Sequence, residues 1–153
     1  MTGTHDDLPL TTPGRARPRR LRRGAVMRDM VRETALRPSQ LIMPHFVLPT
    51  DRGREEIPSM PGIDRLGYED LVNQVEQDLE LGIRQVLLFG LAGHGAKDAH
   101  GTSAADPEGA APMAVYKLKK AFGDDLLVIT DVCLCEYTDH GHCGFLEDGE
   151  VVN

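Results

Sequence analysis

Three cysteines lie in one short segment near the end of the sequence, at Cys133, Cys135 and Cys143. Thiolates are zinc ligands, and an odd number of clustered cysteines is not the pattern of a disulfide framework. Zn²⁺ prefers four tetrahedral ligands, so three protein sulfurs leave one position for water or substrate, as in a catalytic site. The spacing therefore predicts a zinc centre with an open coordination position.

Two other interpretations of these cysteines stay open on sequence alone. Free cysteine is often an ordinary core residue. A nitrogen from His140 or His142 would instead complete a closed structural site with three sulfurs, and the chain would be a small zinc-binding module. A disulfide between Cys133 and Cys135 is disfavoured, because residues two apart on a strand share a face but seldom meet the geometry of that bond.

Asp131 precedes the first cysteine by two residues and follows an apolar run. Reactive groups gather at the carboxyl ends of strands in parallel α/β proteins. If extended backbone continued to Cys135, then Asp131, Cys133 and Cys135 would share one face. A turn at Gly141 would return Cys143 to them. Asp131 is thus a candidate polar partner that orients a metal-bound water or a substrate amine.

Strands and helices alternate in the part of the sequence that must position this segment. We predict strands over 41–48, 86–91 and 126–132, and helices from Tyr68 to Gly82 and from Pro112 to Gly123. The continuous apolar runs indicate strands covered on both faces. Such βαβ units build an α/β fold around a parallel sheet, and barrels and doubly wound sheets both satisfy the pattern.

Three further features complete these local predictions. Pro44 implies a bulge or an edge in the first strand, because proline donates no hydrogen bond. The connection 49–67 is rich in proline and glycine, and we expect it to lie outside the core. We assign no role to His45, His94 and His100, since spacing implies no partner for them.

Charge divides the sequence into two regions. Residues 1–25 carry six arginines and two aspartates, a charge of +4, whereas the remaining 11 basic and 22 acidic residues give −11. No aromatic residue accompanies the arginines to stack on bases, so we expect no nucleic-acid partner. We predict an N-terminal arm with a short helix over 1–38, docked on an acidic neighbouring subunit, and a body over 39–153.

No segment has the roughly 20 apolar residues of a membrane span, and the first 25 residues contain no apolar core of a signal peptide. We therefore expect a cytoplasmic protein that does not interact with membranes.

The cysteine segment 131–144, DVCLCEYTDHGHCG, resembles the zinc-binding segment of porphobilinogen synthases, also called delta-aminolevulinic acid dehydratases. Further matches lie at RPRRLR (17–22), 41–47, SMPG (59–62), and Lys97-Asp98 with Gly101. The resemblance implies a TIM (β/α)8 barrel, an arm that embraces a neighbouring subunit, and a homo-oligomer, commonly an octamer. A complete barrel needs about 250 residues, so these 153 residues correspond to about three βα units.

The resemblance also implies a reaction. Enzymes of this family condense two 5-aminolevulinate molecules to porphobilinogen with loss of two waters, through Schiff bases on two lysines of later strands. Cys133, Cys135 and Cys143 would hold Zn²⁺ for the second substrate, with Asp131 beside it. None of the four lysines in this sequence occupies a position like those Schiff-base segments: Lys97, Lys117, Lys119 and Lys120. We expect the chain to be a partial product, inactive alone.

Overall fold

The computed structural model describes residues 19–152. The chain divides into two compact units, Met1–Leu36 and Arg37–Asn153. The described part of the first unit holds a 3-10 turn, Arg20–Arg22, and the short helix α1, Ala25–Met30. The predicted short helix is therefore present, whereas the arginines at 15 and 17 lie outside the described residues.

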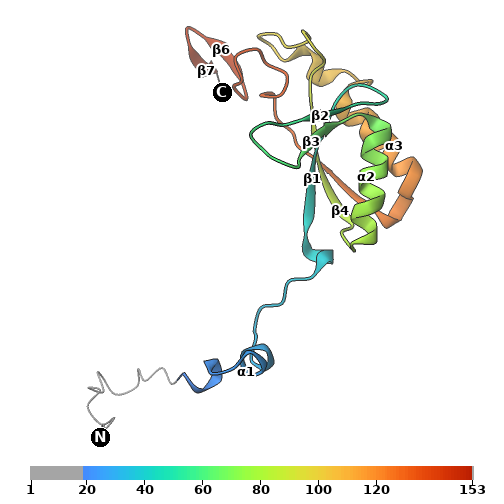
Figure 1. Ribbon diagram of the computed structural model, residues 1–153. Helices are drawn as coiled ribbons and strands as arrows, with labels where there is room; N and C mark the ends of the chain where they lie inside the picture. The colour runs from blue at the N-terminus through green and yellow to red at the C-terminus, as the bar shows by residue number, and fades with distance from the viewer. Residues whose placement is uncertain (1–18, 153) are drawn as a thin grey trace, which may run out of the picture. The chain divides into compact units, whose positions relative to one another are not determined.

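The second unit is built on a mixed sheet of five strands with two helices (Figure 1). The elements are β1 Ile42–Val47, β2 Arg54–Glu56, β3 Asp64–Leu66, α2 Tyr68–Glu80, β4 Gln85–Gly90, α3 Ala110–Phe122 and β5 Leu127–Thr130. The strand order is β2-β3-β1-β4-β5, and only β2 is antiparallel to its neighbour. A separate hairpin, β6 Phe145–Glu147 and β7 Glu150–Val152, ends the described chain.

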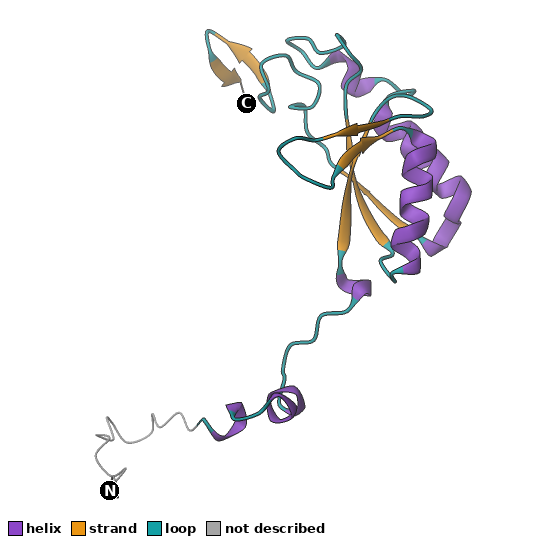
Figure 2. Ribbon diagram, in the orientation of Figure 1, coloured by secondary structure: helices purple, strands orange, loops and turns teal. Residues whose placement is uncertain are grey.

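Both helices cover the same face of the sheet (Figure 2). The strands β1, β4 and β5 are neighbours in chain order, and α2 and α3 contact each other. Leu71 and Val75 of α2, Leu118 of α3, and Val86 and Leu88 of β4 form the centre of the core. A doubly wound sheet carries helices on both faces. The placement of both helices on one face is instead consistent with part of a β/α barrel.

The opposite face of the sheet is apolar but only partly covered. The side chains of Ile42 and Leu127 are 52% and 57% exposed, whereas Val86 and Leu88 on the helix side are fully buried. The rings of Phe46 and Phe89 stack on the open face with centroids 5.3 Å apart. Within the described residues these strands are therefore covered by helices on one face only, and an apolar run shows that a strand avoids water but not what covers it.

Pro44 lies in regular pairing. The register of β1 with β4 runs unbroken through Pro44 and Leu87, so no bulge forms. On its other side β1 pairs with β3 only at Phe46 and Val47. Pro44 therefore lies where one side of β1 has no partner strand among the described residues, which fits the edge alternative.

The connection 49–67 was expected to lie outside the core, and that prediction is wrong. It contains β2 and β3, and Leu66 of β3 is buried in the main cluster. Each of these strands has three residues, which is too short for an alternating pattern to stand out among prolines and glycines.

His45 and Asp78 form a buried pair between β1 and α2. Their Nε2 and Oδ2 atoms lie 2.8 Å apart, and both residues are almost completely buried. No local pattern points to a partner for His45, because the pair joins residues 33 positions apart. Burial lowers the pKa of His45 more than Asp78 raises it, so the imidazole donates to the carboxylate in its neutral form.

The helix α2 ends at a glycine that we expect to be costly to replace. Gly82 has φ +84°, and the amides of Gly82 and Ile83 donate to the carbonyls of Leu79 and Asp78, as in a Schellman motif. Gly82→Ala should destabilise the chain by about 1 to 2 kcal/mol, because a β-carbon disfavours the left-handed conformation. Urea unfolding followed by circular dichroism measures the change.

Glu80→Ala is a suitable control for this substitution, because Glu80 is exposed on the last turn of the same helix. Its effect should stay within about 0.5 kcal/mol. Equal effects of the two substitutions would contradict the role of the glycine.

No helix within residues 19–152 combines the length and the apolar character needed to cross a membrane.

Candidate metal centre

The strand β5 ends at Thr130, earlier than the predicted end at 132. The amide of Asp131 still donates to the carbonyl of Leu88 on β4, and a turn follows. In that turn the amides of Tyr137 and Thr138 both donate to the carbonyl of Leu134, each over 2.9 Å. Extended backbone therefore does not reach the second cysteine, and the predicted alternation along a strand is wrong.

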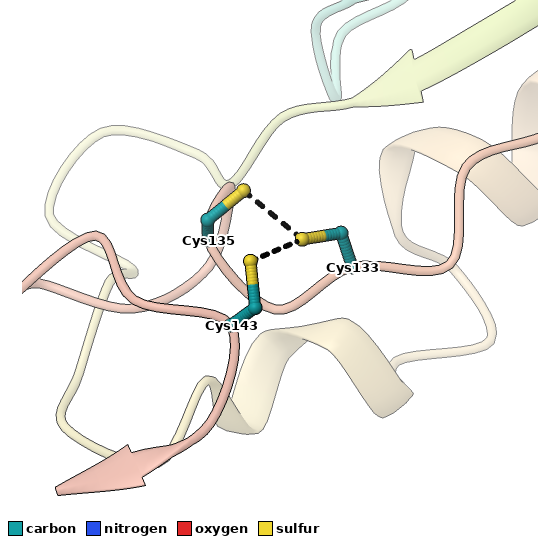
Figure 3. Close-up of side chains that lie close together, drawn as sticks. All are labelled: Cys133, Cys135 and Cys143. Atoms are coloured by element: carbon teal, nitrogen blue, oxygen red, sulfur yellow. Dashed lines mark hydrogen bonds between the residues drawn. The ribbon is translucent and has the colours of Figure 1, made fainter. Parts of the chain in front are cut away.

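The turn nevertheless brings the three sulfurs together (Figure 3). Cys133 Sγ lies 3.1 Å from Cys135 Sγ and 2.8 Å from Cys143 Sγ. All three cysteines are free, two of them partly buried and Cys143 exposed. The interpretation of these residues as ordinary core cysteines is therefore wrong, because none is buried in the apolar cluster.

The sulfurs fit a tetrahedral metal with a small adjustment. Zinc–sulfur bonds of about 2.3 Å in a tetrahedron place sulfurs about 3.8 Å apart. The three thiols, each offering one ligand atom, lie within 4.8 Å of one another. An increase of up to about 1 Å in the distances between the sulfurs would admit the ion. Three thiolates are a donor set for soft and borderline metals, zinc among them.

Two carboxylates lie beside the sulfurs. Asp131, Cys133 and Glu136 form a second group whose potential donor atoms lie within 4.8 Å of one another. The thiol of Cys135 also donates to Glu136 Oε2 over 3.3 Å. We did not predict Glu136, because strand alternation would have placed it on the opposite face from Cys135. The turn that replaces the strand explains the difference.

The side chain of His140 forms hydrogen bonds away from the sulfurs. His140 Nδ1 accepts from the amide of His142 over 3.1 Å, and its Nε2 lies 3.2 Å from the carbonyl of Ala99. Among residues 19–152, neither histidine joins a group of potential metal donors. The geometry therefore does not support a fourth nitrogen ligand from His140 or His142.

The pKa values of the three thiols are shifted in different directions. Hydrogen bonds from the thiol of Cys143, and then from Cys135, lower the pKa of Cys133. Donation to Cys133 raises the pKa of Cys143, and the same donation, with burial and Glu136, raises the pKa of Cys135 to about 12. Cys133 is thus the first thiolate of the metal-free centre, and the other two cysteines keep their protons at neutral pH.

Metal binding should therefore release protons and weaken as the pH falls. Because Cys135 and Cys143 must each lose a proton to become ligands, we expect release of at least about two protons per zinc and a rise in affinity of at least about 100-fold per pH unit near pH 7. Calorimetric titration in buffers of different ionisation enthalpy measures the number released. An enthalpy independent of the buffer would contradict this distribution of protons.

An open cavity of about 630 Å³ adjoins the sulfurs. Asp131, Cys133 and Cys143 line it on one side, and Ala111 and Val115 of α3 line it on another. Its volume lies in the range of small-molecule sites. The three thiols therefore border a space that a small substrate can enter.

Fold and site together define a class: an α/β protein with a largely parallel sheet and a group of three thiols next to its carboxyl edge. The sequence model of the delta-aminolevulinic acid dehydratase family matches residues 15–153. The chain belongs to this family, which confirms the resemblance of the cysteine segment.

Known relatives agree with this assignment. The delta-aminolevulinic acid dehydratase of Helicobacter pylori J99 is 47% identical over 136 residues, which cover 88% of this chain and 41% of that protein. The Bacillus subtilis 168 protein of the same name is 42% identical over 137 residues, 90% of this chain and 41% of its own length. The chain therefore spans about two-fifths of the length of these relatives.

A solved structure also resembles this chain. It is a Toxoplasma gondii delta-aminolevulinic acid dehydratase (porphobilinogen synthase) in complex with the reaction product porphobilinogen. The TM-score is 0.83 at 38% sequence identity, and the match covers 92% of this chain and 40% of the other.

Proposed function

We propose that this chain forms the zinc-binding part of a porphobilinogen synthase, which joins two 5-aminolevulinate molecules to porphobilinogen with loss of two waters for tetrapyrrole synthesis. The observation that carries the proposal is the convergence of Cys133, Cys135 and Cys143 beside an open cavity. The family assignment supports it, and the product named in the Toxoplasma complex supports the choice of substrate.

The residues of the centre have distinct roles in this proposal. The three cysteines would hold Zn²⁺, which would supply Lewis acidity toward a substrate oxygen. Asp131, exposed and close to Cys133, accepts a hydrogen bond from a substrate amine or a bound water. Glu136 accepts a hydrogen bond from the thiol of Cys135 and so helps to position this cysteine.

The Schiff-base lysines of the proposed reaction are assigned to the part of the relatives that this chain does not match. Lys117 pairs with Asp51 at 3.6 Å, and Lys119 donates to the carbonyl of Leu126 at 3.1 Å. Lys120 lies over the ring of Tyr116, and Lys97 lies on an exposed loop. None of these amines has the desolvated setting that activates a lysine nucleophile.

We also propose the assembly that the resemblance implies. Residues 39–153 correspond to the first three βα units of a (β/α)8 barrel, whose remaining units cover the open apolar face of the sheet. Residues 1–38 form an arm that docks on a neighbouring subunit of a cytoplasmic homo-octamer. Val26 and Met30 support the arm, because α1 leaves their side chains 86% and 72% exposed.

A chimaera tests the function directly. Fusion of this chain to the unmatched, later part of the Bacillus subtilis relative should restore a barrel that forms porphobilinogen from 5-aminolevulinate, measured by colour reaction of the product. The 153-residue chain alone should form none. A folded, zinc-loaded chimaera without activity would refute the proposed reaction, and product formed by the chain alone would refute the assignment of the lysines.

A further inference from the structure

The cysteine segment is bound to a loop more than thirty residues earlier in the chain. The amide of Asp98, in the loop after β4, donates to the carbonyl of Tyr137 over 3.3 Å. In return the amide of Asp139 donates to the carbonyl of Asp98 over 3.1 Å. These bonds make a parallel bridge between Asp98 and Thr138, in the stretch that separates Cys135 from Cys143.

The Asp98 side chain fixes the shape of this loop. Its Oδ1 accepts from the amides of His100 and Thr102 over 2.8 and 3.1 Å. These bonds, that of Thr102 foremost, lower the pKa of Asp98. The turn places Gly101, at φ +61°, so close to the cysteine segment that a β-carbon would lie 3.3 Å from Leu134 Cδ2. The loop therefore packs directly on the cysteine segment.

Thr138 continues the connection to the third cysteine. It is 1% exposed, and its hydroxyl donates over 3.0 Å to the carbonyl of His142, the residue before Cys143. His140 Nε2 adds a contact with the carbonyl of Ala99. Cys143 is exposed, so these contacts around it, rather than burial of its own side chain, hold the returning chain in place.

We propose that Asp98 and Thr138 are positioning residues of the metal centre: Asp98 shapes the loop on which the segment rests, and Thr138 returns Cys143 to the other two sulfurs. The inference rests on the proposed binding of metal by the three cysteines. Within residues 19–152, Asp98 belongs to no group of potential metal donors, so it acts through the backbone that it holds. Thr138 likewise acts through the carbonyl of His142.

Cobalt titration of the 153-residue chain tests the proposal. Thiolate-to-cobalt charge-transfer absorption counts the sulfur ligands, and the intensity of the d–d bands reports tetrahedral geometry. Thr138→Val removes the hydroxyl and keeps the shape, and Asp98→Ala removes the acceptor of two amide bonds. Each should weaken Co²⁺ binding by about 10- to 100-fold, the usual effect of losing a group that orients metal ligands.

Conservative variants provide the matched controls. Thr138→Ser keeps the hydroxyl and Asp98→Asn keeps an oxygen acceptor, so both should bind Co²⁺ within about threefold of the parent chain. Amide hydrogen exchange in the metal-free chain gives a second readout. Exchange should quicken within 134–143 in Thr138→Val, while β4 keeps its protection.

The titration distinguishes failure of the proposed metal binding from failure of the positioning roles of Asp98 and Thr138. If the parent chain binds no Co²⁺, the proposed metal function itself fails. If the parent binds through its cysteines and Thr138→Val and Asp98→Ala bind equally well, the positioning roles are refuted alone. Loss of protection throughout the sheet in both variants would also refute them, because the contacts would then support the whole fold rather than the centre.

Discussion

Cys133→Ser is expected to lower the affinity for Zn²⁺ by more than about 100-fold, beyond the effect of losing an outer-shell partner. Cys133 is the central sulfur, in contact with both Cys135 and Cys143, and its thiolate is the first to form. A serine hydroxyl keeps its proton at neutral pH and is a poor substitute for a soft thiolate. Competition with a chromophoric chelator measures the affinity.

His142→Gln is the control that separates the open centre from a closed structural one. His142 is exposed and joins no donor group among the described residues, so its replacement should change zinc affinity by less than about twofold. A loss as large as that of Cys133→Ser would identify His142 as the fourth ligand. The chain would then be a zinc-binding module with three sulfurs and one nitrogen, not a catalytic centre.

His45→Ala is expected to destabilise the fold by about 1 to 3 kcal/mol, the cost of leaving a buried acceptor without its hydrogen-bond donor. The substitution removes the donor 2.8 Å from the carboxylate of Asp78, which lies on the buried side of α2. The free energy of unfolding in urea, followed by circular dichroism, measures the effect. His94→Ala is the matched control, because that histidine side chain is fully exposed and its loss should matter by less than about 0.5 kcal/mol.

The same pair predicts how stability depends on pH. The pKa of His45 is lower in the folded chain than its ordinary value near 6.5, so the unfolded chain binds more protons as the pH falls below that value. The contribution of His45 to stability is therefore present above about pH 6.5 and is lost through acidification. His45→Ala should remove this part of the pH dependence, and an unchanged profile would contradict the assignment.

The elements with a clear period were predictable from the sequence. The apolar stripe and Gly82 predicted α2 to within a few residues, and apolar runs located β1, β4 and β5. The short strands β2 and β3 were not predictable, because three residues do not complete a recognisable pattern. His45 was likewise left without a partner, since nothing local connects a strand histidine to a helix aspartate.

For the candidate metal centre, the sequence by itself determined the candidate donors, the family of the chain and the place of Asp131 near the carboxyl end of an apolar strand. Only the tertiary structure decided how the sulfurs meet. A turn at Leu134, rather than an extended strand, brings Cys135 to Cys133, and it also brings in Glu136. The return of Cys143 depends on a loop far away in sequence, because hydrogen bonds between distant segments leave no periodic trace in either one.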